Sequence, residues 1–388
     1  MKIAIIGAGL AGVEAAVAAK NAGATSVTIF SREAHLPYMR PRLPEIAFGS
    51  GDPSRIAMHP AEWYAEKGIS LKLDTPVTSF EVGDMLMIKT PDGEEIADAL
   101  VLAGGATPLK PVIPGLVSST AVFTLWSADD ARRISSYIRR IRSVAILGGG
   151  ILGVESAIRA RKAGLKVHLI ERQSRVMPLQ FDDAPSAAIA KTLEDLGIKL
   201  HLGASVDSAE EIGSKLGLHL SKEQKTLDVD MVVLAVGARP GIAVAQASGL
   251  TCDHGIIVDE TLQTTCPQIY AAGDCIQYGG QTRNCALAAI TQGRVAGYNA
   301  VVSTGVGTFK SCPADEIPLL YKGSDLELHS WGQTAATCAS AKFERLDDGK
   351  DPKVVRAKVV RSDGTLVGVQ MVGTGEGFDA LVKKRRPA

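Results

Sequence analysis

The sequence has few aromatic residues, no net charge and no long apolar run. Phe, Trp and Tyr make up 5% of its 388 residues, which argues against recognition of nucleic acid by stacking of bases on aromatic rings. Lys plus Arg and Asp plus Glu each number 42, so the formal net charge is zero and no overall field draws the chain to nucleic acid or an anionic membrane. No apolar stretch approaches the roughly 20 residues that cross a bilayer. We therefore expect a globular protein with neither nucleic acid nor membrane as partner.

Cysteine is absent from residues 1–251, and none of the later cysteines belongs to a CxxC pair. The six are Cys252, Cys266, Cys275, Cys285, Cys312 and Cys338. Their spacing argues against a structural zinc site and against the disulfide framework of a small secreted protein. Free thiols in a reducing cytoplasm fit better, and we expect no metal site.

Glycine, in contrast, is abundant, with 40 residues, and two copies of one glycine-rich pattern organise the chain. Residues 2–14 read KIAIIGAGLAGVE, and residues 144–155 read VAILGGGILGVE. Each copy joins an apolar strand to GxGxxG and an Ala-rich helix, and a second strand follows, at 26–30 and at 166–170, with an acid near its end. This order, repeated at an offset of 141 residues (148 minus 7), indicates two dinucleotide-binding βαβ units. Two glycine turns in unrelated units are the alternative.

The three glycines of each copy have separate roles. The first allows a tight turn, the second lets the backbone approach a pyrophosphate, and the third lets the helix pack closely on the strand. Free N–H groups and the helix dipole then hold the anion. The glycines are Gly7, Gly9 and Gly12 in the first copy and Gly148, Gly150 and Gly153 in the second. Two such sites imply two bound dinucleotides.

Three further apolar segments indicate that the chain passes between two sheets. The runs within 99–115 and 230–241 each stop at small residues and are soon followed by proline. Residues 264–275 contain a strand that delivers Gly273 and Asp274 at its end. A lone Gly-Asp is usually only a turn, but this pair stands between an apolar strand and the start of a predicted helix.

A long helix and a hairpin are predicted in the last third of the chain. The helix runs from about Cys285 to Val302, with Asn284 as its N-cap residue. The hairpin joins 354–361 to 366–372 through Ser-Asp-Gly at 362–364.

In these elements and their order, the chain resembles the pyridine nucleotide-disulfide oxidoreductase superfamily of glutathione-reductase-like FAD/NAD(P)H flavoproteins. The tract HLPYMRPRLPEI (35–46) is most similar to NADH:rubredoxin reductases, ferredoxin reductases of oxygenase systems and the flavin domain of nitrite reductases. The resemblance implies an α/β fold with two Rossmann-like domains. A discontinuous FAD domain would occupy 1–110 and 242–310, an NAD(H) domain 111–241, and a small α+β C-terminal domain 311–388. FAD would be the bound cofactor and NADH the electron donor.

The resemblance places an FAD site around the first glycine loop. Ser31 stands where many relatives carry a ribose-binding Glu, and Glu33 takes that role in rubredoxin-reductase-like sequences; an exposed loop glutamate is the alternative. Arg40 and Arg42 belong to the RP-x-L loop beside the cofactor, where an Arg fork suits phosphate or flavin oxygens, although loop arginines are often only solvated. Asp274 would bind the ribityl chain. The expected FAD-binding residues are Gly7, Gly9, Leu10, Ala11, Gly12, Glu33, Arg40, Arg42, Val77, Ala103, Gly104, Gly105, Gly273, Asp274 and Ala288.

The second glycine loop would hold the nicotinamide dinucleotide. Glu171 lies at the end of the second strand, where an acid accepts hydrogen bonds from ribose hydroxyls and repels a 2′-phosphate. NADH is therefore expected over NADPH, although the adjacent Arg172 weakens this preference. The expected NAD-binding residues are Gly148, Gly149, Gly150, Ile151, Leu152, Gly153, Glu171, Arg172 and Gly237.

Glu45 and Glu155 are the candidate catalytic residues, both through the resemblance. Many relatives carry Lys near flavin N5 where this chain has Glu45, as rubredoxin-reductase-like members do. A carboxylate there would alter the flavin potential or proton delivery. Glu155 matches a residue near the nicotinamide carboxamide, but its counterpart in the first copy is Glu14, so a charge on the helix surface is an equal alternative.

Residues 36–50, where disulfide reductases of the superfamily place redox-active thiols, contain no cysteine. Cys275 follows Asp274 and could approach the flavin, but it has no nearby partner, and buried cysteine is usually inert. Without a thiol relay, electrons would leave the flavin directly for a small electron-carrier protein such as rubredoxin or a ferredoxin-like iron–sulfur protein. An NADH oxidase, a nitrite-reductase-type flavin component and a non-catalytic redox-sensing protein are the alternatives.

Basic side chains offer a docking face for an acidic carrier, with solvated helix faces and a frayed tail as the alternative. They are Arg132, Arg133, Arg139, Arg140, Arg142, Arg159, Arg161, Lys162 and the tail KKRRPA at 383–388. The C-terminal region is shorter than the dimerisation domain of larger relatives, so we expect a monomer or a weak dimer.

Overall fold

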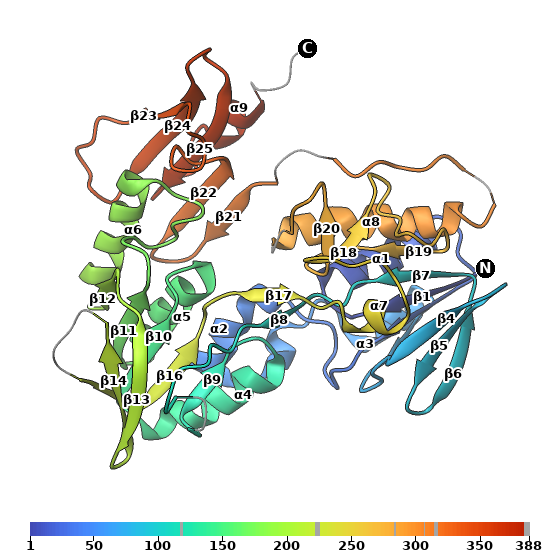
Figure 1. Cartoon of the computed structure of the whole chain (residues 1–388), viewed down its shortest axis with the longest axis horizontal. Helices are drawn as coiled ribbons and strands as arrows, with labels where there is room; N and C mark the ends of the chain where they lie inside the picture. The colour runs from blue at the N-terminus through green and yellow to red at the C-terminus, as the bar shows by residue number, and fades with distance from the viewer. Residues whose placement is uncertain (117–118, 222–225, 283–284, 306, 314–316, 384–388) are drawn as a thin grey trace.

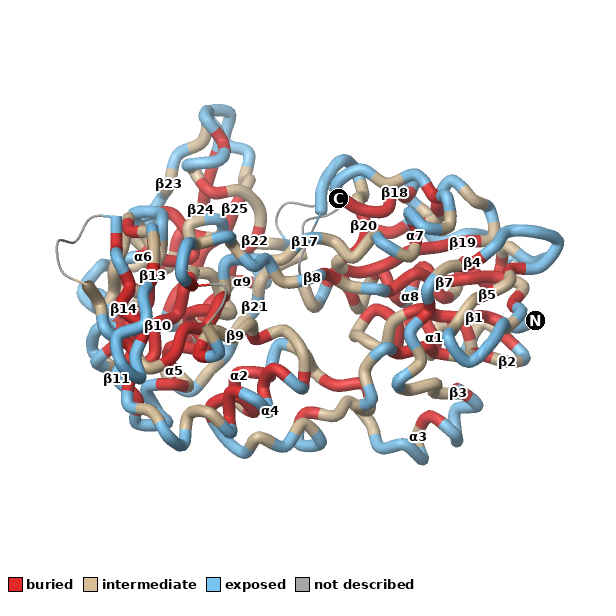
Figure 2. The backbone as a smooth tube through the Cα atoms, turned by 60° about the horizontal axis from the view of Figure 1, so that its bottom comes forward, coloured by how far each residue is buried: buried red, intermediate tan, exposed pale blue. Residues whose placement is uncertain are grey.

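The computed structural model describes residues 1–116, 119–221, 226–282, 285–305, 307–313 and 317–383. Two parallel sheets form two lobes, which lie side by side in Figure 1, and a third, antiparallel sheet stands above the second lobe. Strands of all three sheets are buried (Figure 2). The α/β fold class expected from the sequence is confirmed.

The first lobe is built on a five-stranded parallel sheet whose strands come from distant parts of the chain. Its order is β19 (Ile269–Ala271), β7 (Ala99–Leu102), β1 (Lys2–Ile6), β2 (Ser26–Phe30) and β3 (Ile69–Lys72). The strand predicted at 26–30 is confirmed as β2. Smaller elements complete the lobe: α3 (Ala61–Glu66), β4 (Ser79–Val82), β5 (Leu86–Thr90), β6 (Gly93–Ala97), α7 (Ala243–Ala247), β18 (Ile256–Val258) and β20 (Ile276–Tyr278).

Two helices of the first lobe, α1 (Leu10–Asn21) and α8 (Ala286–Val302), pack at very short range. A Cβ atom on Gly293 would lie 2.3 Å from the carbonyl oxygen of Ala11, and one on Gly297 would lie 2.1 Å from that of Ala15. The contact therefore requires glycine at both positions of α8. The helix predicted from about Cys285 begins at Ala286 with Cys285 as its N-cap residue, and Asn284 lies outside the described residues.

The second lobe repeats the design with a contiguous stretch of chain. Its sheet has the order β12 (Lys199–Leu202), β11 (Lys166–Glu171), β10 (Ser143–Leu147), β16 (Met231–Leu234) and β9 (Val122–Thr124). The second strand predicted at 166–170 is confirmed within β11. The other elements are α4 (Ala128–Tyr137), η4 (Ile138–Arg140), α5 (Ile151–Lys162), α6 (Asp183–Asp195), β13 (Val206–Ile212), β14 (Lys215–Leu220) and β15 (Leu227–Val229).

Two connections join the lobes. A short antiparallel ribbon of β8 (Ala106–Pro108) and β17 (Ala238–Pro240) runs between them (Figure 1). The tract of η1 (Arg40–Arg42), α2 (Leu43–Glu45), η2 (Ile46–Ser50) and η3 (Pro53–Ile56) comes early in the chain, yet its apolar side chains pack in the core of the second lobe. The tract predicted to lie beside the cofactor thus also anchors one lobe to the other.

The C-terminal sheet has the order β21 (Leu319–Lys322), β22 (Glu327–Gly332), β25 (Leu366–Val372), β24 (Val355–Arg361) and β23 (Ala341–Arg345), followed by α9 (Phe378–Lys383). The predicted hairpin is confirmed as β24 and β25. The buried carboxylate of Asp182 ties this sheet to the second lobe, since it accepts hydrogen bonds from Gln370 Nε2 at 2.8 Å and from the N–H of Ala335 at 2.9 Å. Among the described residues, no helix is both long and apolar enough to cross a membrane.

Candidate dinucleotide-binding site

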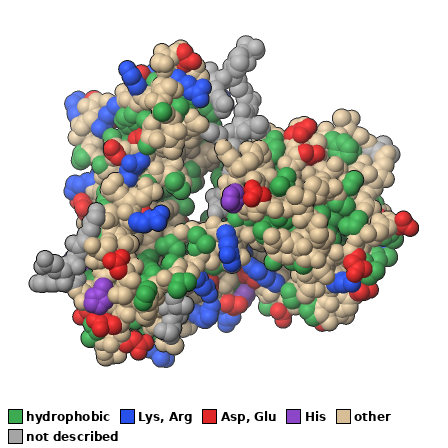
Figure 3. All heavy atoms as spheres, viewed as in Figure 1, with side chains coloured by type: hydrophobic (Ala, Val, Ile, Leu, Met, Phe, Trp, Pro, Cys, Tyr) green, Lys and Arg blue, Asp and Glu red, His purple; other side chains and the backbone are tan. Residues whose placement is uncertain are grey.

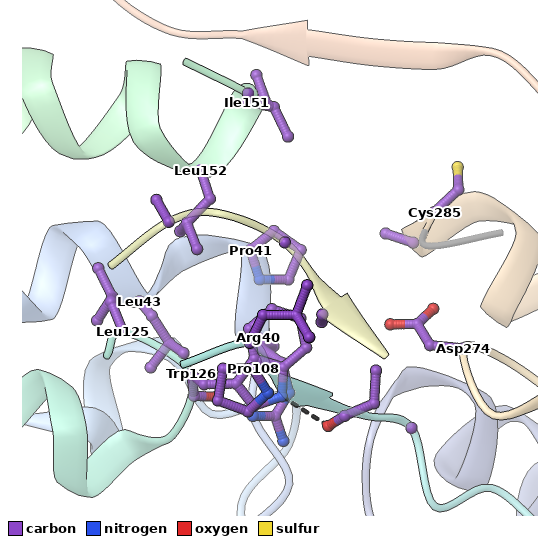
Figure 4. A pocket seen from close by; sticks show the side chains of 18 of the residues that line it. Arg40, Pro41, Leu43, Pro108, Leu125, Trp126, Ile151, Leu152, Asp274 and Cys285 are labelled. Atoms are coloured by element: carbon purple, nitrogen blue, oxygen red, sulfur yellow. Dashed lines mark hydrogen bonds between the residues drawn. The ribbon is translucent and has the colours of Figure 1, made fainter. Parts of the chain in front are cut away.

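One cavity of about 1140 Å³ lies between the two lobes, and both glycine loops line it. The tract at η1, the β8–β17 ribbon, the start of α8 and strand β21 complete its wall. Figure 4 shows side chains from these elements around one part of the cavity, with Asp274 and Cys285 on one side and Ile151 and Leu152 on another. Both predicted dinucleotide sites therefore open into a single space.

The first glycine loop has the backbone of a phosphate cradle. Gly7 has φ +112°, and a Cβ there would lie 2.1 Å from the carbonyl oxygen of Ala103. A Cβ on Gly12 would lie 1.9 Å from the oxygen of Gly7, so only glycine lets α1 approach the strand this closely. At Gly9, which precedes α1 and lines the cavity, a Cβ would meet no described atom within 4 Å. Backbone N–H groups at the helix start are thus open to an anion.

The second loop repeats this geometry. Gly148 has φ +107°, and a Cβ there would lie 2.3 Å from the oxygen of Ala235. A Cβ on Gly153 would lie 1.9 Å from the oxygen of Gly148, while one on Gly150 would point to open space among the described residues. The two cradles fit two pyrophosphates, and hence FAD and a nicotinamide dinucleotide.

Glu33 sits in a network that spans both lobes. Its carboxylate accepts hydrogen bonds from Tyr38 Oη at 2.7 Å and Arg40 Nη2 at 2.9 Å. Arg40 also donates to the carbonyl oxygen of Trp126, and the N–H of Ala128 donates to Tyr38 Oη at 3.1 Å. Glu33 lines the cavity and is not a free loop glutamate. Each carboxylate oxygen keeps a lone pair for a further donor such as a ribose hydroxyl.

Glu171 is held against the second glycine loop. Its Oε2 accepts the N–H of Gly149 at 2.7 Å, and its Oε1 accepts the N–H of Gln173 at 2.7 Å. Glu171 and the exposed Arg172 both line the cavity, as expected for the acid and its neighbour at the end of the second strand.

Asp274 and the start of α8 line the cavity next to the first glycine loop, since Gly273 packs against Ala11 at the start of α1. Asp274 lines the cavity, and burial raises the pKa of its carboxyl to about 6, against the opposing charge of Arg40. The preceding Gly273 has φ +82°, and its N–H donates to the buried Gln292 Oε1 at 2.9 Å. This hydrogen bond holds the turn before Asp274 against α8, the helix to which Gln292 belongs.

Four charged side chains, Arg42, Glu45, Glu155 and Arg159, form what we call the carboxylate–arginine cluster. Arg42 donates to both oxygens of Glu45 at 3.0 Å, and Arg159 Nη2 lies 3.4 Å from Glu45 Oε1 and 3.9 Å from Glu155 Oε1. Burial raises the pKa of Glu155 to about 7, Arg159 opposes that shift, and Glu45 adds to it. Glu155 lines the cavity and is not an exposed helix charge.

The remaining expected residues fall into two groups. Those that line the cavity are Leu10, Ala11, Ala103, Gly104, Gly105, Gly273, Ile151, Leu152 and Gly237. Those that do not line it are Gly12, Gly149 and Gly153, which pack inside the glycine loops, together with Arg42, Glu45, Val77 and Ala288. Val77 is buried in the core of the first lobe, and Ala288 is buried within α8.

Sequence reasoning missed Tyr38, Trp126, Tyr321 and Cys285, all of which line the cavity. Burial raises the pKa of Tyr321 to about 12, so its hydroxyl stays neutral near pH 7. Cys285 had a signal, because the predicted helix start placed it beside Asn284. Tyr38 also had one, because it lies in the tract 35–46 that the sequence placed beside the cofactor. Trp126 and Tyr321 had none, since they lie far from both glycine loops in the sequence.

Cys275 is a buried packing residue, as the sequence analysis favoured over an approach to the flavin. Cys275 is fully buried, its thiol donates to the carbonyl oxygens of Leu102 and Ala272, and burial raises its pKa to about 11. Cys285 is the cysteine that lines the cavity. The six cysteines are all free, and no group of three or more His, Cys, Asp or Glu in the described part of the chain could hold a metal ion.

Comparison with known proteins identifies relatives over most of the chain. The model of the family "Pyridine nucleotide-disulphide oxidoreductase" matches residues 1–293. A rubredoxin-NAD(+) reductase of Pseudomonas putida is 32% identical over 278 residues, which are 71% of this chain and 72% of that protein. An NADH oxidase of Methanocaldococcus jannaschii is 30% identical over 98% of this chain and 90% of its own length. A ferredoxin reductase of Rhodopseudomonas palustris has a similar crystal structure, with TM-score 0.87, 27% identity, and coverage of 99% of this chain and 93% of that one.

Proposed function

The chain belongs to the pyridine nucleotide-disulphide oxidoreductase family, and from this premise we propose that it passes electrons from NADH through FAD to a small electron-carrier protein such as rubredoxin or a ferredoxin-like iron–sulfur protein. It is an FAD-dependent NAD(H) oxidoreductase. The relatives named for rubredoxin, rhodocoxin and dioxygenase ferredoxin systems support the carrier as acceptor.

The single cavity shared by both glycine loops carries this proposal. Two dinucleotides with their pyrophosphates on Gly9 and Gly150 would extend into the same space, where the ring systems can meet. Holding two reactants at contact distance supplies a large part of a rate enhancement, because the entropy of bringing them together is lost on binding. When bound, FAD accepts a hydride from NADH and releases electrons one at a time, which the protein alone cannot do.

The residues of the first lobe would fix the FAD. Glu33, held by Tyr38 and Arg40, would accept hydrogen bonds from the adenosine ribose. Asp274 would accept from the ribityl chain, and the N-terminus of α8 would place its partial positive charge beside the ring system. Val77 and Ala288 would support this wall from behind.

The residues of the second lobe would select NADH. Glu171 is anchored by the N–H of Gly149, so its carboxylate cannot turn away from the ribose to admit a 2′-phosphate without losing that bond. Arg172 is exposed beside it and would lessen the discrimination, not reverse it.

Direct exit of electrons from the flavin fits the placement of the thiols. Residues 36–50 carry none, Cys275 is buried with a raised pKa, and Cys285 is the one cavity thiol among the described residues. A dithiol relay would need two cysteines at the cavity. The carrier would therefore accept electrons at the cavity mouth.

The carrier's docking face is not a single basic patch. Basic and acidic side chains are interspersed on the face in Figure 3. Several candidate basic residues are already paired: Arg132 with Asp129 at 3.8 Å, Arg133 with Asp130 at 2.6 Å, and Lys162 with Asp325. Of the tail, all but Lys383 lies outside the described residues. We propose that a small carrier docks through the shape of its surface more than through opposite charge. We also propose that the protein is a monomer or weak dimer in the cytoplasm, where its six cysteines remain free thiols.

An NADH oxidase is the second candidate, and one observation favours it. The relative of that name matches 98% of this chain, more than the rubredoxin reductase does. Oxygen would then take the carrier's place at the same cavity.

Acceptor comparison on the purified protein tests these proposals. We expect a yellow protein with one noncovalent FAD per chain, bleached by NADH much faster than by NADPH, and reoxidised faster by rubredoxin or ferredoxin than by oxygen. A colourless folded protein that cannot be reconstituted with FAD would overturn the proposal. Reoxidation by oxygen at the carrier's rate would favour the oxidase instead.

A further inference from the structure

Arg159 stands between two carboxylates that come from different lobes. Its Nη2 lies 3.4 Å from Oε1 of Glu45, on α2, and 3.9 Å from Oε1 of Glu155, on the same helix as Arg159. Two carboxylates in one cluster repel each other, and such a pair keeps at least one member protonated unless a cation separates them. Arg159 is placed to be that cation.

The two arginines of the cluster share Glu45 but differ at Glu155. Arg42 donates to both oxygens of Glu45, and Arg159 Nη2 lies 3.4 Å from the same carboxylate. Among the described residues, the one ion pair of Glu155 is with Arg159. Arg159 is therefore the arginine in direct contact with Glu155, and Arg42 acts on that carboxylate only from a greater distance.

Glu155 faces the cavity as well as the cluster. The charged and titratable groups that face it are Arg159 on its own helix, Glu45 and Arg42 from the tract at η1 and α2, and Tyr321 from β21. Its pKa is raised to about 7, mainly by burial. The charge of the cavity wall at this point therefore changes within the physiological pH range.

We propose that Arg159 is a positioning residue that sets the charge of Glu155, and that Glu155 through this charge controls how tightly the cavity holds oxidised relative to reduced nicotinamide. The inference rests on the proposed function, in which the nicotinamide dinucleotide on the second glycine loop extends into the cavity that Glu155 lines. The nicotinamide ring of NAD⁺ carries a positive charge and that of NADH carries none, so an ionised Glu155 favours NAD⁺ by Coulomb attraction. Release of NAD⁺ should then become slower as the pH rises, and binding of NADH should be favoured relative to that of NAD⁺ as the pH falls.

Binding equilibria on the FAD-loaded protein test this without turnover. The probes are NAD⁺ and 1,4,5,6-tetrahydro-NAD, whose ring is neutral and cannot donate hydride. We expect the ratio of the two affinities to rise about tenfold in favour of NAD⁺ across the titration of Glu155 near pH 7. In Glu155→Gln the ratio should not change with pH.

Variants at the two neighbours should shift this transition in opposite directions. Arg159→Gln removes the cation and moves the midpoint to higher pH, whereas Glu45→Gln removes the repelling carboxylate and moves it to lower pH. Arg159→Lys keeps the positive charge, so the midpoint should return toward its wild-type pH. Arg161→Gln is the matched control, because it loses the same charge from the same helix but its Nε donates to the carbonyl oxygen of Leu196.

Carbon-13 NMR of the Glu155 carboxyl, assigned with Glu155→Gln, gives the same midpoints without nicotinamide. The inference is overturned if Arg159→Gln and Arg161→Gln move the midpoint equally, or if Arg159→Gln and Glu45→Gln move it in the same direction. If Arg159→Gln does not fold, Glu45→Gln tests the inference instead: a midpoint at lower pH than in the wild type supports it, and any other result overturns it. If the carboxyl titrates as expected but NADH does not bleach the FAD, the proposed function fails and the role of Arg159 stands.

Discussion

The two glycine loops have nearly the same backbone but hold their acids in different ways. In the second copy, position 149 is glycine, and a Cβ there would lie 3.0 Å from Cβ of Glu171. The bare backbone lets Glu171 fold onto the loop and accept the N–H of Gly149. The first copy has Ala8 at this position, and its acid, Glu33, lies farther along the chain in the network of Tyr38 and Arg40. Glu171 is therefore held directly by its own glycine loop, whereas Glu33 is held by Tyr38 and Arg40, which in turn bond to the second lobe.

The glutamate after each glycine motif shows the same divergence. Glu14 lies on α1 and pairs with the exposed Arg294 at 2.7 Å. Glu155 occupies the matching place on α5 but is buried at the cavity beside Arg159. The repeat explains where these residues lie along their helices, and the packing around each helix decides what they do.

The largest expected effect comes from the third glycine of each copy. Gly12→Ala and Gly153→Ala each force a Cβ to within 1.9 Å of a carbonyl oxygen, and overpacking of this kind costs about 1–3 kcal/mol. We expect Gly12→Ala to purify without FAD, and Gly153→Ala to keep FAD but lose its bleaching by NADH. Absorbance spectra and stopped-flow reduction measure both. The reverse pattern would exchange the assignments of the two loops.

Glu155 should make the stability of the protein depend on pH. The folded-state pKa of Glu155 is raised from 4.5 to about 7, so its contribution is present below pH 4.5 and is lost as pH rises through 7. The loss is at most about 3 kcal/mol of unfolding free energy.

Urea denaturation at pH 5 and pH 8 measures this difference. Glu155→Gln should reduce the loss on going to pH 8, and Glu14→Gln, which breaks an exposed pair, should change stability by less than about 1 kcal/mol at either pH. An equal pH response in the wild type and Glu155→Gln would show that Glu155 titrates normally.

Gly149→Ala should weaken the preference for NADH. The added Cβ displaces the Glu171 side chain and its bond to the loop N–H, so the ratio of flavin bleaching rates with NADH and NADPH should fall about tenfold, the equivalent of roughly one charge-assisted hydrogen bond. Ala8→Gly is the control in the first copy and should leave this ratio unchanged. If Gly149→Ala keeps the wild-type ratio, Glu171 does not select the dinucleotide.

The smallest expected effect comes from Cys275 and Cys285, the two cysteines next to Asp274 and at the start of α8. Cys285→Ser changes a cavity residue, and Cys275→Ala changes a buried one. If electrons leave the flavin directly, Cys285→Ser should keep its turnover with a one-electron acceptor within about twofold of the wild type. The serine hydroxyl can donate a hydrogen bond in place of the thiol. Loss of acceptor turnover by orders of magnitude with normal NADH reduction would reveal a thiol relay. Cys275→Ala reports on packing, through its FAD content.

Local patterns predicted the regular elements well. Apolar runs bounded by glycine placed β2 and β11, and the Ser-Asp-Gly turn placed the hairpin of β24 and β25, because each depends on neighbours in sequence. The glycine roles and the position of Glu171 followed from the same local geometry.

Contacts across the fold could not be predicted in this way. Nothing near Glu33 in the sequence indicates that Trp126 and Ala128 of the other lobe complete its network. The packing of the tract at 40–56 in the second core, and the approach of Glu45 to Arg159, depend on how the lobes meet. Contacts between residues so far apart leave no periodic pattern and no short motif in the sequence, so the sequence does not predict them.

Strand β19 also bears on how the protein is synthesised. The sheet of the first lobe is completed only when Ile269–Ala271 pairs with Ala99–Leu102, and α1 finds its glycine partners only on the still later α8. At about 5–20 residues per second, the ribosome needs roughly 10–30 s to make the intervening chain. During that time the contiguous strands of the second lobe emerge and can pair with one another. The strands β1, β2, β3 and β7 of the first lobe are therefore translated before the second lobe, but their sheet can be completed only after the strands of the second lobe have been made.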